Sequence, residues 1–85
     1  MLSILFFGQL RERLNTERLT VDISTLAKPN TVGSLCAYLS DLGPQWAELI
    51  RVDNCLVAVN QTMATQNTAI NADDEIALFP PVTGG

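Results

Sequence analysis

Two consecutive prolines near the end of the chain limit how far the folded domain can extend. The segment Glu75–Phe79 is typical of a β-strand, and Pro80 and Pro81 follow it directly. Because proline has no N–H donor and fixes φ at about −65°, the pair cannot extend a sheet ladder and favours an extended backbone. The sequence therefore predicts a domain over residues 1–79 and an extended, flexible tail over residues 80–85.

The tail ends in a glycine pair, Gly84 and Gly85. At roughly 3.3 Å per residue, the segment Pro80–Gly85 spans about 20 Å. Glycine has no Cβ, so two glycines in succession give a thin backbone that can enter a narrow channel. A frayed terminus is the simpler alternative, because small residues often collect at disordered chain ends. We favour a functional tail whose reactive group is the carboxylate of Gly85.

Length and composition point to one small folded domain. The chain has 85 residues, of which 47% are hydrophobic and 16% are charged. That balance is ordinary for a globular domain and excludes a disordered one. No apolar stretch approaches the roughly 18 residues of a membrane-spanning helix, and Ile4–Phe7 is not followed by a signal-peptide cleavage pattern. We expect a cytoplasmic protein without a membrane partner.

The chain lacks the side chains that most catalytic sites use. It contains no histidine and no glycine-rich motif for ATP or a dinucleotide. Cys36 and Cys55 are too few and too far apart for a disulfide framework, so we expect free, buried thiols. The run Asp73–Glu75 is more typical of solvated charge than of a metal site. We therefore expect a carrier that binds no cofactor or metal of its own.

The charge distribution excludes a nucleic-acid binder. The net charge is −4, and the basic residues balance the acidic ones as far as Arg51. The excess lies in the second half, at Asp53 and in the run Asp73–Glu75. An acidic surface of this kind is steered toward a basic partner and away from nucleic acid.

Hydrophobic periodicity predicts five strands and three helices. Alternating or continuous apolar runs predict strands at Met1–Phe7, Leu19–Ile23, Cys55–Val59, Met63–Thr65 and Glu75–Phe79. Helical spacing predicts a short helix, the main helix after the N-cap Thr31, and a further short turn, at Gln9–Leu14, Val32–Leu42 and Gln45–Ile50. Ile70 is expected to enter the core from a loop.

One main helix against a mixed sheet predicts a two-layer α+β domain. Placing the first and last strands side by side in the centre of the sheet gives a ubiquitin-like β-grasp fold. This placement uses analogy, because the strand pattern by itself does not fix the order of strands in the sheet.

Strand parity marks one candidate docking surface. In the last strand Ile76 and Leu78 point to one face, and Phe79 points to the other. Phe7 has the same relation to the first strand. If the first face meets the helix, Phe7 and Phe79 form an exposed apolar patch beside the tail, a feature typical of interfaces. The alternative is that both aromatic residues lie in the core, and the sequence does not decide between these two interpretations.

Three segments resemble the small subunit of molybdopterin synthase: Ile4–Glu12, Val57–Thr62 and Phe79–Gly85. The match covers nearly the whole chain in order, and the ending Phe-Pro-Pro-Val-Thr-Gly-Gly is specific to that family among sulfur carriers. Ubiquitin is similar in fold, but its tail is basic before the glycine pair.

The resemblance implies a sulfur-transfer mechanism. An E1-like adenylyltransferase would use ATP to convert the Gly85 carboxylate to an acyl-adenylate, and sulfur would then replace AMP. The thiocarboxylate would enter the large synthase subunit and donate sulfur to cyclic pyranopterin monophosphate, which forms molybdopterin. Catalytic side chains would come from the large subunit, in a heterotetramer built around a dimer of large subunits.

The resemblance also assigns roles by position. Gly85 carries the sulfur, Gly84 is its slender neighbour, and the partner-binding residues are Phe7, Arg11, Met63, Phe79, Pro80, Pro81, Val82 and Thr83. The family has leucine where this chain has Met63, and a flexible thioether keeps the hydrophobic contact. The alternatives are a solvated helix charge for Arg11 and an ordinary loop residue for Met63.

Two other functions fit the same features. The chain could carry sulfur in another pathway, such as thiamine synthesis or protein conjugation. It could also be a β-grasp interaction module whose tail is never activated.

Overall fold

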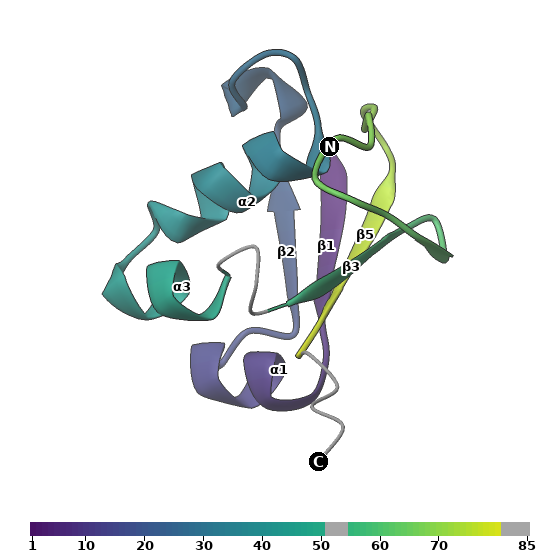
Figure 1. Cartoon of the computed structure of the whole chain (residues 1–85). Coiled ribbons are helices and arrows are strands. Elements are labelled where there is room, and N and C mark those ends of the chain that lie inside the picture. The colour runs from purple at the N-terminus through teal and green to yellow at the C-terminus, as the bar shows by residue number, and fades with distance from the viewer. Residues whose placement is uncertain (51–54, 81–85) are drawn as a thin grey trace.

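The computed structural model describes residues 1–50 and 55–80 of the chain. Their backbone forms a mixed five-stranded sheet in the order β2-β1-β5-β3-β4, with the helices on one of its faces (Figure 1). The strands are β1 (Leu2–Phe6), β2 (Arg18–Val21), β3 (Leu56–Val59), β4 (Thr62–Met63) and β5 (Glu75–Phe79). The helices are α1 (Gly8–Leu14), the 3-10 helix η1 (Ile23–Thr25), α2 (Val32–Ser40) and α3 (Pro44–Leu49).

The first and last strands lie side by side, as the β-grasp arrangement predicts. β1 pairs with β5 in parallel, and Ile4 lies opposite Ile76. β2 flanks β1 on one side, and β3 flanks β5 on the other, both antiparallel. β5 is therefore the middle strand of the sheet. β5 is the last strand in the sequence and lies in the centre of the sheet. The chain therefore leaves the sheet at the end of its middle strand.

The main helix is anchored by a capping box at its start. The Thr31 hydroxyl accepts a hydrogen bond from the Ser34 N–H, and the Ser34 hydroxyl accepts one from the Thr31 N–H. These bonds satisfy backbone donors that the first turn leaves free. The prediction placed the end at Leu42, but the helix ends at Ser40 and Leu42 is exposed. Leu42 therefore makes no contribution to the buried face of this helix.

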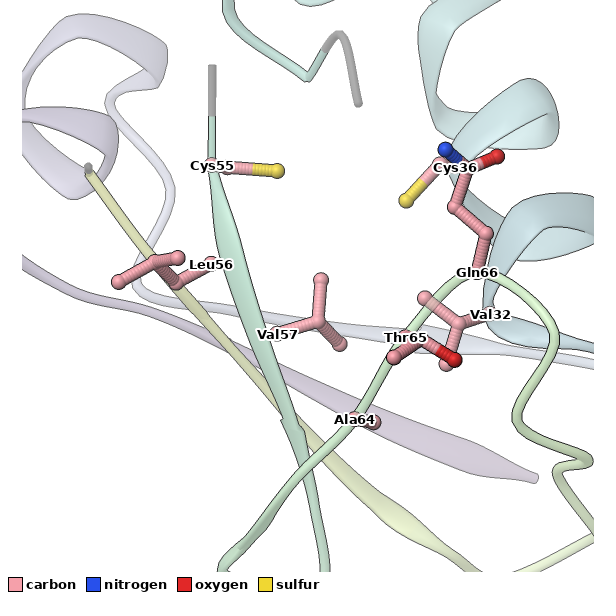
Figure 2. A pocket seen from close by; sticks show the side chains of 8 residues that line it. All are labelled: Val32, Cys36, Cys55, Leu56, Val57, Ala64, Thr65 and Gln66. Carbon is pink, nitrogen blue, oxygen red and sulfur yellow. The ribbon is translucent and has the colours of Figure 1, made fainter. Parts of the chain in front are cut away.

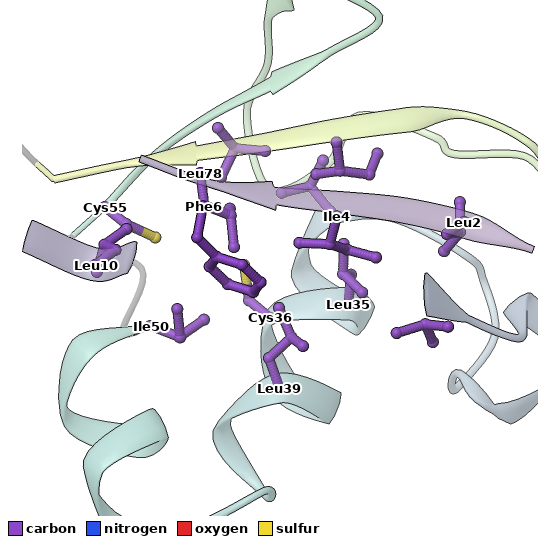
Figure 3. Packing of buried hydrophobic residues seen from close by; sticks show 14 of the residues in the cluster. Leu2, Ile4, Phe6, Leu10, Leu35, Cys36, Leu39, Ile50, Cys55 and Leu78 are labelled. Carbon is purple, nitrogen blue, oxygen red and sulfur yellow. The ribbon is translucent and has the colours of Figure 1, made fainter. Parts of the chain in front are cut away.

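The core lies between the sheet and the helices. Figure 3 shows side chains from β1 and β5 pointing toward α2, with Phe6 between them and Leu39. The Phe6 ring meets the ring of Trp46 edge to face, with centroids 5.6 Å apart. Ile70 is buried and enters the core from a loop, as predicted. Cys36 and Cys55 are free and buried, which is also as predicted.

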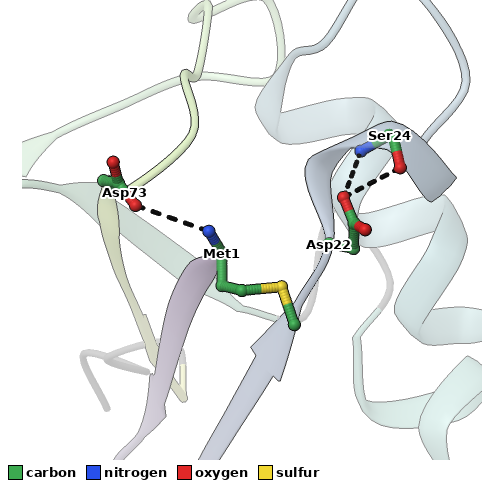
Figure 4. Close-up of polar contacts among 4 residues, drawn as sticks. All are labelled: Met1, Asp22, Ser24 and Asp73. Atoms are coloured by element: carbon green, nitrogen blue, oxygen red, sulfur yellow. Dashed lines mark hydrogen bonds and ion pairs between the residues drawn. The ribbon is translucent and has the colours of Figure 1, made fainter.

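Four of the five strands differ from the prediction by one or two residues at their ends, and local structure explains the differences in β2 and β4. β2 ends at Val21 because Asp22 caps the η1 turn: its carboxylate accepts bonds from the N–H and hydroxyl of Ser24 (Figure 4). β4 begins at Thr62 because the turn before it has only two residues, Asn60 and Gln61, both with positive φ. This turn geometry suits the twist of a hairpin and sets Thr62 opposite Val59.

The acidic turn before β5 uses its carboxylates for structure. Asp74 accepts hydrogen bonds from the Asn71 N–H at 2.8 Å and from the Asn60 side-chain amide at 3.0 Å. Asp73 has a φ of 74° and lies 3.4 Å from the terminal ammonium of Met1 (Figure 4). The Asn60 bond fixes the hairpin turn against the start of β5, and the Asp73 contact joins the same segment to the start of the chain. Across residues 1–50 and 55–80, no three metal-binding side chains gather.

None of the helices described in this structure is long and apolar enough to cross a membrane.

Candidate functional site

The root of the tail is where β5 leaves the sheet. The ladder between β1 and β5 continues past the end of β1, because the Phe7 N–H donates to the Leu78 carbonyl at 3.1 Å. Pro80 then packs on Gly8, which has a φ of +59°. A Cβ at Gly8 would lie 3.1 Å from Cγ of Pro80, so the absence of a side chain permits this close approach. The strand therefore ends at Phe79, as the prolines predict.

The two aromatic residues of the candidate docking surface are stacked. The Phe7 and Phe79 rings have centroids 4.9 Å apart and planes inclined by 12°. Phe7 lies just after β1 and Phe79 ends β5, so the parallel pairing of these strands brings the two rings together. The stack is immediately next to Pro80 and so marks the point at which the tail departs.

Sheet register extends this stack into a larger apolar surface. Leu56 lies opposite Phe79, which continues the surface onto β3. Two residues earlier along β1 and β5, a second row of paired positions crosses four strands: Leu5, Ala77, Ala58 and Met63. Because side chains at paired positions share a face, the set forms one surface. Ala58 is buried within this surface, and we call the other members the outer patch: Leu5, Phe7, Leu56, Met63, Ala77 and Phe79.

The outer patch lies on the sheet face away from the helices. Phe7, Leu56 and Met63 expose 41%, 39% and 62% of their surfaces. Phe79 and Leu5 are half-buried. An aliphatic and aromatic surface of this kind on a small domain is typical of a docking site. The position of Phe7 and Phe79, which the sequence left open, is thus the outer face and not the core.

Leu56 is the member of the outer patch that sequence reasoning missed. The run Cys55–Val59 was interpreted as a buried strand, and Cys55 and Val57 are indeed buried. Leu56 falls between them and so points to the opposite face. Strand parity contained this signal, but using it required knowing that β3 lies next to Phe79.

Arg11 lies beside the patch and not within it. It is exposed on α1, the helix that packs next to the end of β5 where the tail begins (Figure 1). Among the residues whose placement is described, Arg11 forms no ion pair. A guanidinium in this position is available to pair with a carboxylate of another protein. Its contact with a partner remains a prediction.

The structure thus brings together some of the predicted site residues. Phe7, Met63 and Phe79 share the outer face, Pro80 lies at its edge, and Arg11 stands on the adjacent helix. The remaining predicted residues, Pro81, Val82, Thr83, Gly84 and Gly85, lie outside the described residues.

Comparison with known proteins places the whole chain in one family. The ThiS family matches residues 4–85. The chain belongs to the ThiS family. A curated relative, the molybdopterin synthase sulfur carrier subunit of Haemophilus influenzae, is 36% identical, with 100% of both chains covered. The family match includes the outer patch and every residue of the tail.

Solved structures support the same fold for this ThiS-family chain. SAMP1 from Haloferax volcanii superposes with a TM-score of 0.75 at 30% identity, over 99% of this chain and 98% of that one. A chain in the complex of subunits 1 and 2 of the molybdopterin-converting factor from Helicobacter pylori also matches. Its TM-score is 0.62 at 27% identity, over 99% of this chain and 97% of that one. These likenesses confirm the ubiquitin-like β-grasp fold, with a mixed sheet around one main helix.

Proposed function

We propose that this ThiS-family chain is the sulfur carrier subunit of a molybdopterin synthase. The observation that carries the proposal is its full-length likeness to a Haemophilus influenzae protein of that name. The outer patch supports it, since an apolar docking face beside Pro80, where the predicted tail begins, suits a subunit that inserts its end into a partner. The chain supplies the sulfur-bearing terminus of a sulfurtransferase.

The reactive atom belongs to the Gly85 carboxylate. A carboxylate is a poor electrophile, so an E1-like adenylyltransferase first transfers AMP from ATP to it and releases pyrophosphate. A sulfur donor then displaces AMP, and the C-terminal carbonyl carries a thiocarboxylate sulfur. ATP is bound by the activating enzyme, and this chain holds no cofactor of its own. Gly84 and Gly85 keep the approach unhindered because neither has a Cβ.

The large synthase subunit is the proposed partner of the outer patch. Phe7, Phe79 and Met63 supply apolar contacts, and Arg11 pairs with an acidic group at their border. The tail from Pro80 to Gly85 enters the active site of the large subunit, whose side chains catalyse sulfur transfer to cyclic pyranopterin monophosphate. The Helicobacter pylori complex of subunits 1 and 2 supports such an assembly. We propose the heterotetramer of the family, working in the cytoplasm.

The intact mass of the chain tests activation directly. The purified chain is incubated with the activating enzyme, ATP and a sulfur source. We expect a species heavier by the difference between one sulfur and one oxygen atom, with the added mass on Gly85. A chain extended by one residue after Gly85 is the matched control and should keep its original mass. An unchanged mass in the native chain would leave the tail as an ordinary binding peptide and contradict the proposal.

A reconstituted synthase tests the pathway. The thiocarboxylated chain is mixed with the large subunit and cyclic pyranopterin monophosphate, and molybdopterin is measured. Deleting Gly84 and Gly85 should abolish the product and leave the unfolding transition unchanged, because the carboxylate would end too far from the active site. Product formation at the native rate by the truncated chain would contradict the role of the tail.

Protein conjugation is a second candidate, favoured by one observation. The chain is 30% identical to a Haloferax volcanii protein described as small archaeal modifier protein 1. In that case the activated Gly85 would form an amide with a lysine of another protein. The two candidates separate in one experiment: the activated chain is offered both the large synthase subunit and a cell extract, and its products are identified by mass. Covalent conjugates without molybdopterin formation would favour the second candidate.

A further inference from the structure

A cavity that the carrier function does not use lies on the helix side of the sheet. It has a volume of about 280 Å³, and its lining comes from α2, the start of β3 and the segment after β4. Figure 2 shows Cys36 on α2 and Cys55 just before β3, with both sulfur atoms directed into the space between these elements. The two cysteines of the chain, which are 19 positions apart (55 − 36), therefore meet in one cavity.

The two thiols interact with each other. A hydrogen bond to Cys55 raises the pKa of the Cys36 thiol, and burial raises it further. The same hydrogen bond lowers the pKa of the Cys55 thiol, against the opposing effect of burial. Cys55 is the thiol that ionises first, and the thiolate is the nucleophilic form.

We propose that Cys36 and Cys55 form an oxidisable pair that a hydroperoxide converts to an intramolecular disulfide. Two observations carry the proposal: the sulfur atoms come from different elements yet both point into the space between α2 and β3, and one cavity adjoins both (Figure 2). The cavity far exceeds the roughly 30 Å³ that one water molecule occupies in the liquid, so it can admit a peroxide molecule. This proposal is independent of sulfur carriage, because neither cysteine belongs to the outer patch or the tail.

The reaction takes two balanced steps. The Cys55 thiolate attacks one oxygen of hydrogen peroxide, an S–O bond forms, the O–O bond breaks, and the departing hydroxide becomes water on taking up a proton. The Cys36 sulfur then attacks the Cys55 sulfenic acid: the S–S bond forms, the S–O bond breaks, and the hydroxide leaves as water with the Cys36 proton. The two sulfurs lose two electrons in total, and the peroxide is reduced to two water molecules.

Burial favours the internal disulfide over a bond between two molecules. Cys36 and Cys55 expose 4% and 8% of their surfaces, so a thiol on another chain has little access to them. A small oxidant can enter the cavity where a protein thiol cannot. The disulfide would join the main helix to the strand that carries Leu56, and so link the helix layer to the sheet.

Mass spectrometry of the full chain tests the pair. The reduced protein is treated with hydrogen peroxide, unfolded, and exposed to iodoacetamide. We expect a monomer lighter by two hydrogen atoms that takes up no label, and a digest that contains the Cys36 and Cys55 peptides joined. Reduction should restore two labelled thiols. Oxidation of Met1 or Met63 is distinguished because it adds an oxygen atom. Two fully labelled thiols after peroxide treatment, or covalent dimers in place of the internal bond, would overturn the proposal.

Single variants test the order of the two steps. In Cys36→Ser the sulfenic acid at Cys55 has no resolving thiol, so dimedone should trap it. In the matched variant Cys55→Ser, labelling of Cys36 should be at least tenfold lower. Equal dimedone labelling of the two variants would overturn the assignment of Cys55 as the attacking thiol. Because the disulfide is measured in the native chain, a variant that folds poorly leaves the main test intact.

Discussion

The two faces of the sheet differ in what covers them, although the same strands supply both. On the inner face Ile4, Phe6 and Leu78 are completely or almost completely buried under the helices. On the outer face Phe7 is 41% exposed and only one position from Phe6. Both faces carry large apolar side chains, although the outer face also includes Ser3 and Glu75, so an apolar side chain by itself does not separate core from docking surface. Coverage by α2 and α3 makes the distinction.

This difference teaches that one strand can carry stability and recognition together. Because successive side chains point to opposite faces, alternate residues of β1 and β5 belong to the core and to the outer patch. A slip of one residue in register would exchange the two sets completely. The pairing of Ile4 with Ile76 and of Leu5 with Ala77 therefore fixes both the stability of the domain and the composition of its outer surface.

The largest expected effect comes from the inner face. Phe6→Ala removes a ring that is 1% exposed and packs edge to face on Trp46. We expect the free energy of unfolding to fall by about 3 to 5 kcal/mol, because a buried cavity replaces the ring. Urea unfolding followed by circular dichroism measures the change. A loss below about 1 kcal/mol would mean that the two faces do not differ as described.

The next effect belongs to the outer face and appears in binding. Phe79→Ala removes a half-buried ring from the centre of the outer patch. We expect affinity for the large synthase subunit to fall by about 2 kcal/mol, or about 30-fold, as for a central interface residue. Calorimetric titration of the native and variant chains measures it.

The same variant should lose much less folding stability than Phe6→Ala. A stability loss of about 3 to 5 kcal/mol in Phe79→Ala, with unchanged affinity, would place this ring in the core and break the comparison.

A smaller effect is expected between the stacked rings. The Phe7 and Phe79 rings have centroids 4.9 Å apart. A double-mutant cycle with alanine at each position should give a coupling of about 0.5 to 1.5 kcal/mol in the free energy of unfolding. The pair of Phe7 and Met63 serves as a control, because the structure shows no ring contact between them, and its coupling should be close to zero. Equal couplings in both cycles would contradict a specific stack.

The smallest effect is expected at a polar contact that belongs to neither face. Hydrogen bonds from the N–H and hydroxyl of Ser24 lower the pKa of the Asp22 carboxyl. A lowered pKa in the folded state means that the carboxylate stabilises the fold above its unfolded pKa, and that this contribution disappears as the pH falls through the folded pKa. Asp22→Ala should therefore be slightly less stable than the native chain at neutral pH.

The pH dependence sharpens this measurement. The stability difference between the native chain and Asp22→Ala should stay constant down to about pH 5 and then shrink as the carboxyl is protonated. Urea titrations at a series of pH values measure it, with Asp41→Ala as a control on another exposed carboxylate. A difference that grows on acidification would contradict the sign of the pKa shift.

Much of the fold could be predicted from local pattern. The strand Glu75–Phe79 was predicted with its observed bounds, and the start of the main helix at Val32 follows from Thr31 as N-cap. One error arose where a local polar bond overrode hydrophobicity. Alternation alone continued the second strand to Ile23, but Asp22 turns the backbone there by bonding to Ser24. Strand propensity takes no account of a side chain that forms hydrogen bonds to nearby backbone groups and so ends the strand.

The candidate site was predicted less completely than the fold. Phe7, Phe79 and Met63 were identified and lie on one face. Leu56 was missed, because its place in the outer patch depends on pairing with Phe79, which is 23 positions later (79 − 56) in the chain. The meeting of Cys36 and Cys55 was missed for the same reason. Spacing along the sequence gives no sign of contacts made through the folding of the sheet.

The sequence by itself determined which residues alternate along each strand, where the main helix begins, and why the sheet stops at Pro80. Each of these depends on the chemistry of a residue and its close neighbours in the chain. Only the tertiary structure decided which apolar face remains open and which residues from distant strands share it. Those outcomes depend on pairing between segments far apart in sequence and on which face of the sheet the helices cover. Burial is a property of the packed chain and not of any one segment.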